Sequence, residues 1–169
     1  MQTSCPPYTK SLLRHFVDLH EGTHHGVTAR PDKERLFNKA VALVDPYARK
    51  TLEEINACLL LGTGHVTATG IRRSPDGDVD AIWALSWPQQ QTAGINPVVI
   101  RAYFGRGFHH PHLRSGTVGD WPFNVYDDEQ AAAELPTLRA IASTDLHNLV
   151  FHLGGDVRVI PAILSEPAP

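Results

Sequence analysis

The chain has very little sulfur and no long hydrophobic run. Its 169 residues include one methionine and two cysteines, Cys5 and Cys58. Two cysteines this far apart form neither a disulfide framework nor the paired spacing of a zinc knuckle. Nowhere do 18 consecutive apolar residues occur, which is the length that a membrane-spanning helix needs. The first ten residues lack the basic and apolar segments of a signal peptide, and we therefore expect a cytoplasmic protein.

Positive charge is also scarce and scattered. Lysines and arginines number 15 against 18 aspartates and glutamates, which gives a formal net charge of −3 with neutral histidines. Nucleic acids and anionic membranes are bound through concentrated basic surface, and no block of basic residues stands out. We therefore expect neither as a partner. The sequence also lacks a GxGxxG fingerprint, a P-loop and any visible internal repeat.

Against this background the abundant residue is histidine. The hydrophobic content of 42% and the charged content of 20% are ordinary for a globular protein, and the length suits one domain. The chain has ten histidines, however, and six of them lie at positions 20–25 and 109–112. Histidine titrates near neutral pH and binds transition metals, so the clusters indicate either proton transfer or metal binding.

Hydrophobic periodicity predicts helices in the first third of the chain. Apolar residues recur at helical spacing over Ser11–His20, with His20 in the middle of the apolar stripe and His15 near its edge. Asp32 is the expected N-cap of a second helix. Asp45-Pro46 resembles the start of a third helix, which would meet the second at an angle because proline cannot continue a helix unbroken.

From His65 onward the period changes to two, which predicts an antiparallel meander. Helices grouped before and after the strands favour an α+β fold, with three to four strands and helices packed on one face. We expect a single domain over residues 11–164, an irregular arm over 1–10 and a disordered tail over 165–169. The expected segments are strands Val66–Arg73, Val79–Trp87 and Val98–Phe104, a loop Pro88–Pro97, a helix from Asp127 to about Leu153 interrupted at Pro136, and a last strand Val157–Pro161.

The segment Gly105–Asn124 is the main candidate for a site. It reads GRGFHHPHLRSGTVGDWPFN, and its glycines and prolines predict a long shaped loop at a strand end. In an extended segment, residues two apart point the same way, so His110 and His112 are expected to reach one metal ion. The proline between them restricts the backbone and lowers the entropy that is lost on binding.

A third ligand must come from elsewhere. Two histidines and a carboxylate form the open site of non-haem iron enzymes and of some zinc enzymes. We take Asp120 as the first-choice carboxylate and His24 as a further ligand of a divalent transition metal, iron or zinc. His109 is expected to face the opposite side. The candidate catalytic residues are His109, Asp145 and His152, the last two lying on one helix face.

The same segment carries groups suited to substrate binding. Arg106 and Arg114 flank the histidines and could bind a carboxylate or phosphate bidentately. Phe108 and Trp121 could line an apolar pocket beside them. The leading hypothesis is a small metal-dependent enzyme, of hydrolytic or oxygen chemistry, whose substrate is a small, partly apolar or anionic molecule.

Two alternatives remain open. One is a metal-free enzyme in which His110 or His112 acts as an acid, base or nucleophile in phosphoryl or nucleotidyl chemistry. The H-P-H tripeptide at 110–112 resembles an element of the histidine-triad-like nucleotidyltransferases, but the residues that follow it there are absent, and we assign no family. The other is a non-catalytic metal-binding or ligand-binding accessory protein. Homodimer formation is also left open.

Overall fold

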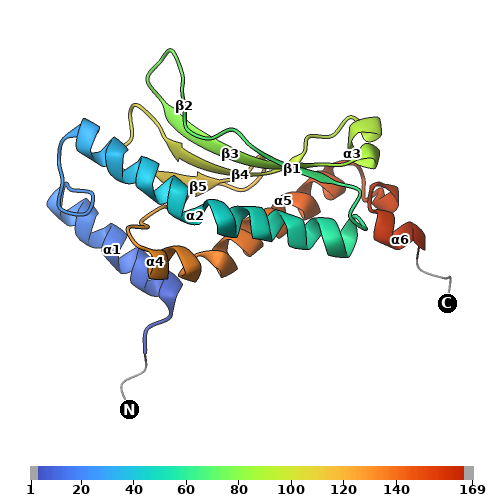
Figure 1. Cartoon of the computed structure of the whole chain (residues 1–169), viewed down its shortest axis with the longest axis horizontal. Helices are drawn as coiled ribbons and strands as arrows, with labels where there is room; N and C mark the ends of the chain where they lie inside the picture. Colours follow the sequence, from blue (N-terminus) through green and yellow to red (C-terminus); the bar gives the residue numbers. More distant parts are fainter. Residues whose placement is uncertain (1–3, 166–169) are drawn as a thin grey trace.

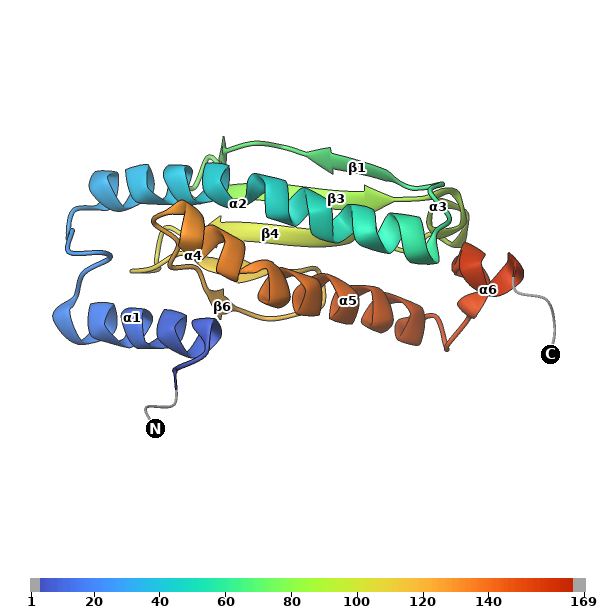
Figure 2. The same cartoon turned by 60° about the horizontal axis from the view of Figure 1, so that its bottom comes forward.

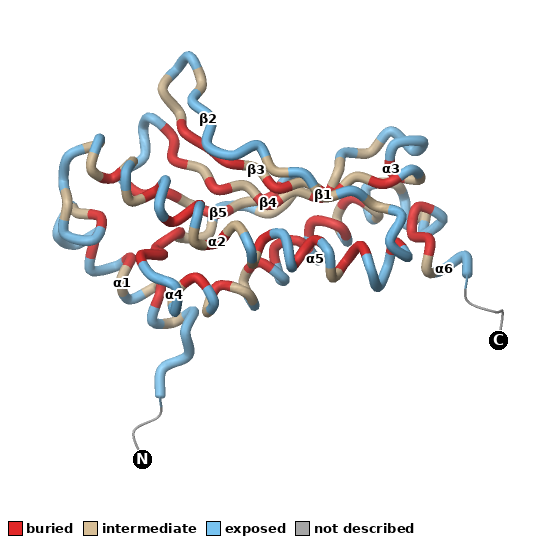
Figure 3. Tube along the Cα trace, viewed as in Figure 1, coloured by how far each residue is buried: buried red, intermediate tan, exposed pale blue. Residues whose placement is uncertain are grey.

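Two alternating strands form the centre of the sheet. In the computed structural model, which describes residues 4–165, β3 (Val79–Ser86) pairs antiparallel with β4 (Val98–Phe104), so that Trp83 lies opposite Ile100. Every second residue of both strands is buried, and the positions between them are less buried (Figure 3). This period of two is what an antiparallel sheet with one covered face requires, and it confirms the predicted strand Val98–Phe104.

The complete sheet is larger than expected. Within residues 4–165 it has six strands in the order β1-β3-β4-β5-β6, with β2 paired to β3 (Figure 1). The predicted α+β class, with an antiparallel sheet and helices on one face, is confirmed. The added strands are too short to show a period, and the expected strand Val66–Arg73 is divided in two around Gly70, whose φ is +67°. The additional bounds are β1 His65–Ala68, β2 Arg72–Arg73, β5 His112–Arg114 and β6 Trp121–Pro122.

Two long helices, α2 (Arg30–Leu59) and α5 (Leu135–His152), cover one face of the sheet (Figure 2). The prediction of a break at Pro46 was wrong, because α2 continues through it. An internal proline costs about 3 kcal/mol. The buried stripe of α2 runs across this position through Phe37, Val44 and Leu52, each fully buried, and burying each contributes roughly 1.5–3 kcal/mol. Packing on the sheet therefore outweighs the proline.

The ends of the chain also differ from the prediction. The expected last strand is instead a 3-10 turn, Val157–Val159, followed by α6 (Pro161–Ser165). Trp87 donates through Nε1 to the Val159 carbonyl at 2.6 Å, which fixes this turn beside the sheet. A short helix, α3 (Pro88–Ala93), replaces part of the expected loop. The expected tail lies outside the described residues except for Ser165, which ends α6. No helix of residues 4–165 is long and apolar enough to cross a membrane.

The first helix is oriented opposite to the expectation. α1 (Pro7–Glu21) begins inside the predicted arm and buries Ser11, His15 and Asp18 against the rest of the protein. The apolar residues of α1 face outward, and His20 is exposed with them. α1 lies beside β6 and α4 (Asp128–Ala133), and Asp127 is the N-cap of α4 (Figure 2). A polar helix face therefore contacts the segment that carries the histidines.

Candidate functional site

Two cations at the start of α2 hold the histidine-rich loop in place. The Arg30 guanidinium lies 3.5 Å from the Phe104 ring centroid and donates to the carbonyls of Phe104 and Gly105 at 3.0 and 2.9 Å. Lys33 is buried and donates from Nζ to the His109 carbonyl at 3.1 Å. Backbone carbonyls in a glycine-rich loop need such donors, because no ladder partner is available to them.

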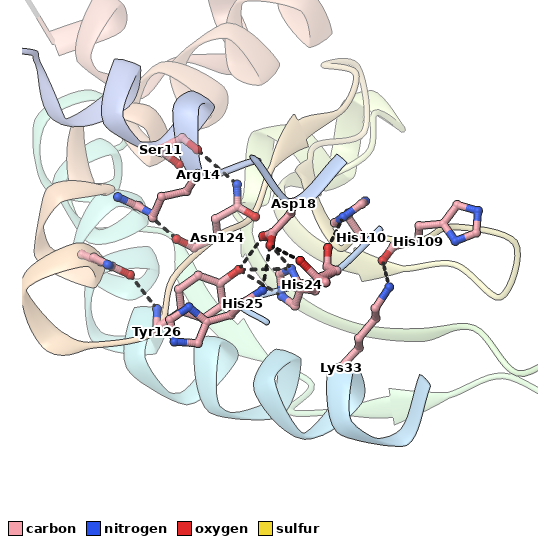
Figure 4. Close-up of polar contacts among 12 residues, drawn as sticks. Ser11, Arg14, Asp18, His24, His25, Lys33, His109, His110, Asn124 and Tyr126 are labelled. Carbon is pink, nitrogen blue, oxygen red and sulfur yellow. Dashed lines mark hydrogen bonds and ion pairs between the residues drawn. The ribbon is translucent and has the colours of Figure 1, made fainter. Parts of the chain in front are cut away.

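His110 joins the two histidine clusters of the sequence. Its Nε2 lies 2.7 Å from the carbonyl oxygen of Thr23 (Figure 4). A carbonyl can only accept, so Nε2 carries the proton and, in the neutral ring, Nδ1 keeps its lone pair. His110 itself is only 4% exposed. This contact fixes both the tautomer and the position of the ring.

His15 of α1 lies against both loop histidines. Its ring centroid is 5.1 Å from that of His110 and 6.0 Å from that of His112. Among the described residues, the Nδ1 atoms of His15 and His112 are buried and have no hydrogen-bond partner. Buried polar atoms are rarely left unpaired, so two in adjacent rings call for a partner. We call His15, His110 and His112 the histidine triplet.

Burial keeps the triplet neutral. The pKa of each ring is lowered from its ordinary value, first by burial and further by neighbouring histidines; Asp18 opposes this at His15 and His110, and Asp120 opposes it at His112. Burial lowers the pKa because it disfavours the charged imidazolium. A neutral imidazole has the lone pair that a metal or a proton needs.

A hydrogen-bonded group that contains Asp18, His24 and Tyr126 lies beside His110 (Figure 4). Asp18 accepts at Oδ1 from Thr23 Oγ1 at 2.9 Å and from the His25 amide at 3.0 Å, and its other oxygen lies 3.5 Å from Tyr126 Oη. Tyr126 Oη is in turn 3.1 Å from His24 Nδ1. Burial lowers the pKa of His24 to about 4 and raises that of Tyr126. His24, His110 and His15 thus form a continuous series of close rings, with His24 and His110 centroids 5.9 Å apart.

The ligand set expected from the sequence is only partly brought together. Across residues 4–165 no three histidine, cysteine, aspartate or glutamate side chains are arranged to hold one ion. His110 lies beside His24, but His112 approaches His15 instead. Asp120 is exposed and is bound by Arg114, whose Nε donates to it at 2.7 Å. The carboxylate chosen from the sequence is therefore engaged by an arginine.

The residues expected to be catalytic lie away from the triplet. The ring of His109 is exposed and points away from the cluster in Figure 4, as expected. His152 is exposed at the end of α5. Asp145 is fully buried, and its oxygens accept from the Val99 amide at 3.0 Å and from the Thr117 hydroxyl at 2.6 Å. Asp145 therefore holds the turn after β5 against the edge of β4.

The residues expected to bind substrate divide into two groups. Phe108 is 40% exposed, and its ring centroid lies 5.6 Å from that of His112. Arg114 shares the uncovered sheet face with His112, and its guanidinium lies over the Tyr103 ring. Arg106 is exposed on the loop, and Trp121 packs against the core on the opposite sheet face. Phe108 and Arg114 are therefore the two that border the triplet.

Sequence reasoning missed His15, Asp18 and Tyr126 as site residues. Asp18 is only 6% exposed, although aspartate side chains are mostly found in solvent. A signal was present, because Ser11, His15 and Asp18 recur at spacings of four and three and so form a polar stripe on one face of a helix. No protein-family model, curated protein or solved structure matches this chain.

Proposed function

We propose that the protein is a small metal-dependent enzyme whose ion is held by the histidine triplet, His15, His110 and His112. The observation that carries the proposal is the pair of buried, unpartnered Nδ1 atoms on His15 and His112, beside a third ring whose Nδ1 has a lone pair. Three imidazoles that leave one position open are an arrangement of catalytic zinc. Zinc is favoured over iron, because the iron sites that use histidines add a carboxylate.

Two of the three ring spacings are compatible with this proposal, although among residues 4–165 no three such side chains are already arranged around one point. Two imidazoles that share one tetrahedral ion at about 2.1 Å have centroids about 5 Å apart. The His15–His110 and His15–His112 separations are 5.1 and 6.0 Å. Loading requires the rings to turn toward one point, and the outer torsion of a histidine side chain has a broad minimum that permits this. The Nε2 contact of His110 with Thr23 is the kind of outer contact that orients metal-binding histidines.

The substrate is proposed to approach from the uncovered sheet face. His112 is the most exposed member of the triplet and borders Phe108, which offers an apolar surface. Arg114 lies two residues further along β5, on the same sheet face, and its charge lowers the pKa of His112. A small molecule with an apolar part and a carboxylate or phosphate fits these two neighbours. An ion there would supply Lewis-acid or water activation.

The test is metal binding by protein made without an affinity tag. Zinc content is measured by mass spectrometry after dialysis, and zinc affinity by competition with a chromogenic chelator. Each of His15→Ala, His110→Ala and His112→Ala is expected to lower the affinity at least tenfold, since one of three ligands is lost. The control is His147→Ala, an exposed histidine of α5. Equal affinity in all variants would contradict the metal proposal.

A second candidate is a metal-free acid–base enzyme built on Asp18, Tyr126 and His24. It is favoured by one observation: Asp18 and Tyr126 line an open groove of about 440 Å³ together with Arg14. Tyr126, whose pKa is raised by burial, is a perturbed titratable group in this groove, and such groups mark candidate catalytic sites. Hydrolysis of p-nitrophenyl acetate and of p-nitrophenyl phosphate, measured before and after metal chelation, distinguishes the metal-dependent enzyme from the metal-free one. Activity that survives chelation and is lost in Asp18→Asn favours this candidate.

A further inference from the structure

One carboxylate on the uncovered sheet face, that of Asp80, holds two arginines. It accepts from Nε and Nη2 of Arg72, both at 3.0 Å, and from Nε of Arg101 at 2.8 Å. The Arg101 guanidinium also lies 4.5 Å from the Tyr103 ring centroid. Because Asp80 is only 7% exposed, its position and those of both guanidiniums are restricted. Asp80 neutralises one of these two positive charges and leaves the other.

A second carboxylate near the hairpin of β2 and β3 is shared in the same way. Glu34 of α2 pairs with both Arg30 and Arg73. In the remainder of residues 4–165, each arginine ion pair joins one arginine to one acid, as between Arg139 and Glu54. Like charges held side by side repel, so a network that serves stability alone gains nothing from the extra guanidiniums. The excess of arginine at this hairpin therefore points to a negative group from outside the chain.

The hairpin also contains a cavity of about 330 Å³, which is within the size range of small-molecule sites. Its lining has three arginines and two aspartates, a formal charge of +1, whereas the whole chain has −3. Glu34 binds Arg73 from outside the cavity, and its charge is offset by its second partner, Arg30. A positive cavity in a negative chain attracts anions. The lining residues are Arg72, Arg73, Ser74, Asp78, Asp80 and Arg101.

The cavity can still offer hydrogen-bond donors after these contacts. A guanidinium has five N–H groups, and Arg72 and Arg101 each direct two nitrogens at Asp80. Ser74 Oγ accepts from the Asp78 amide at 3.2 Å and can donate its own proton to a ligand. Asp78 in turn accepts from the Arg106 amide at 2.6 Å. Two guanidiniums and one hydroxyl can therefore donate to a single bound group.

We propose that this cavity binds the phosphate group of a small phosphomonoester. A phosphate has three terminal oxygens and can accept from both guanidiniums and from Ser74 at once, whereas a carboxylate has only two. The cavity is formed by β2, β3 and β4, whereas His112 lies on β5. The proposal therefore does not depend on a metal at the histidine triplet.

The test is calorimetric titration of the full chain with phenyl phosphate, in the presence of EDTA so that no metal contributes. Wild type and the control Arg139→Gln, an exposed arginine outside the cavity, are expected to bind equally. Arg72→Gln and Arg101→Gln are each expected to weaken binding at least tenfold, because a charge-assisted hydrogen bond is lost. Arg72→Lys should recover only part of the affinity, since lysine keeps the charge without the planar fork. Benzoate, with a carboxylate in place of the phosphate, should bind at least tenfold more weakly.

Three results would overturn the proposal. The first is the absence of saturable phenyl phosphate binding by wild type. The second is equal affinity in Arg72→Gln and Arg139→Gln, which would place the bound phosphate elsewhere. The third is benzoate that binds as tightly as phenyl phosphate and is lost in Arg72→Gln, which would make the ligand a carboxylate. The Arg72 side chain is 49% exposed, so its variants are expected to fold even if Arg101→Gln does not, and circular dichroism of each variant checks this.

Discussion

His110 Nε2 and the Thr23 carbonyl oxygen lie 2.7 Å apart and join loops that are 87 residues apart in sequence. The loop after α1 and the loop after β4 carry separate histidine clusters in the sequence. This one bond brings them together and assigns the tautomer of His110. His15 then completes the triplet from the inner face of α1. The site is therefore shared by three segments, and each can be tested separately.

The hydrogen bonds from Arg30 to the loop carbonyls are predicted to stabilise the folded protein. Arg30→Gln removes donors to the carbonyls of Phe104 and Gly105 and the contact with the Phe104 ring. We expect a loss of about 2–4 kcal/mol in the free energy of unfolding, because carbonyls of the loop are left unpaired. Hydrogen exchange of amides 105–110 should also become faster. The control is Arg35→Gln, an exposed arginine of the same helix. Equal urea midpoints for both variants would contradict this prediction.

Asp145 is predicted to be structural. Asn in its place keeps one acceptor and turns an amide group toward donors such as the Val99 amide and the Thr117 hydroxyl. We expect Asp145→Asn to lower the free energy of unfolding by about 2–4 kcal/mol and to leave zinc affinity within twofold. The measurement is urea unfolding beside the chelator competition. A tenfold loss of zinc affinity in folded Asp145→Asn protein would instead show that Asp145 contributes to zinc binding.

The burial of Glu134 is predicted to make the free energy of unfolding depend on pH. It is 4% exposed at the junction of α4 and α5, and burial raises its pKa to about 7 from an ordinary 4.5, with Arg14 opposing the shift. The folded state therefore favours the protonated carboxyl. This penalty on the charged form is absent below pH 4.5, grows between pH 4.5 and 7, and reaches about 3 kcal/mol above it.

Glu134→Gln removes that titration and keeps the side-chain shape. The stability of the variant relative to wild type should therefore rise by up to about 3 kcal/mol between pH 5 and pH 8. Urea unfolding at the two pH values measures the difference, and other titrating groups cancel in it. Glu129→Gln, an exposed position of α4, serves as the control. A difference that does not change with pH would refute the expected titration of Glu134.

The sheet was the part of the fold most accessible from sequence. Val98–Phe104 has an apolar residue at every second position, these residues are the buried ones, and the bounds of the strand are as predicted. Pro46 was misinterpreted because local preference favours a break, whereas the fully buried residues on both sides of it hold α2 together. The prediction of a strand over Val157–Pro161 was wrong because the segment is too short. Five mostly apolar residues do not distinguish a strand from a packed turn.

The candidate site was harder to predict from the sequence than the sheet. The loop histidines could be identified from their density, but α1 carries two stripes of the same period, one apolar and one polar. Sequence alone favours burying the apolar stripe, and this prediction placed His15 near the edge of the buried face. The partners that hold the polar stripe inward, such as Asn124 and Tyr126, lie more than 100 residues away. Only the fold brings them to α1.

The most direct test of the metal proposal is X-ray absorption spectroscopy of the zinc-loaded protein at stoichiometric zinc. The spectrum counts nitrogen and oxygen neighbours and recognises imidazoles by their outer-shell scattering. The proposal predicts three imidazoles in wild type and in the control His147→Ala, and two in His15→Ala. Because His15 comes from α1 and not from the histidine-rich loop, this variant separates the triplet from a site built on the loop alone. An unchanged imidazole count in His15→Ala would contradict the account.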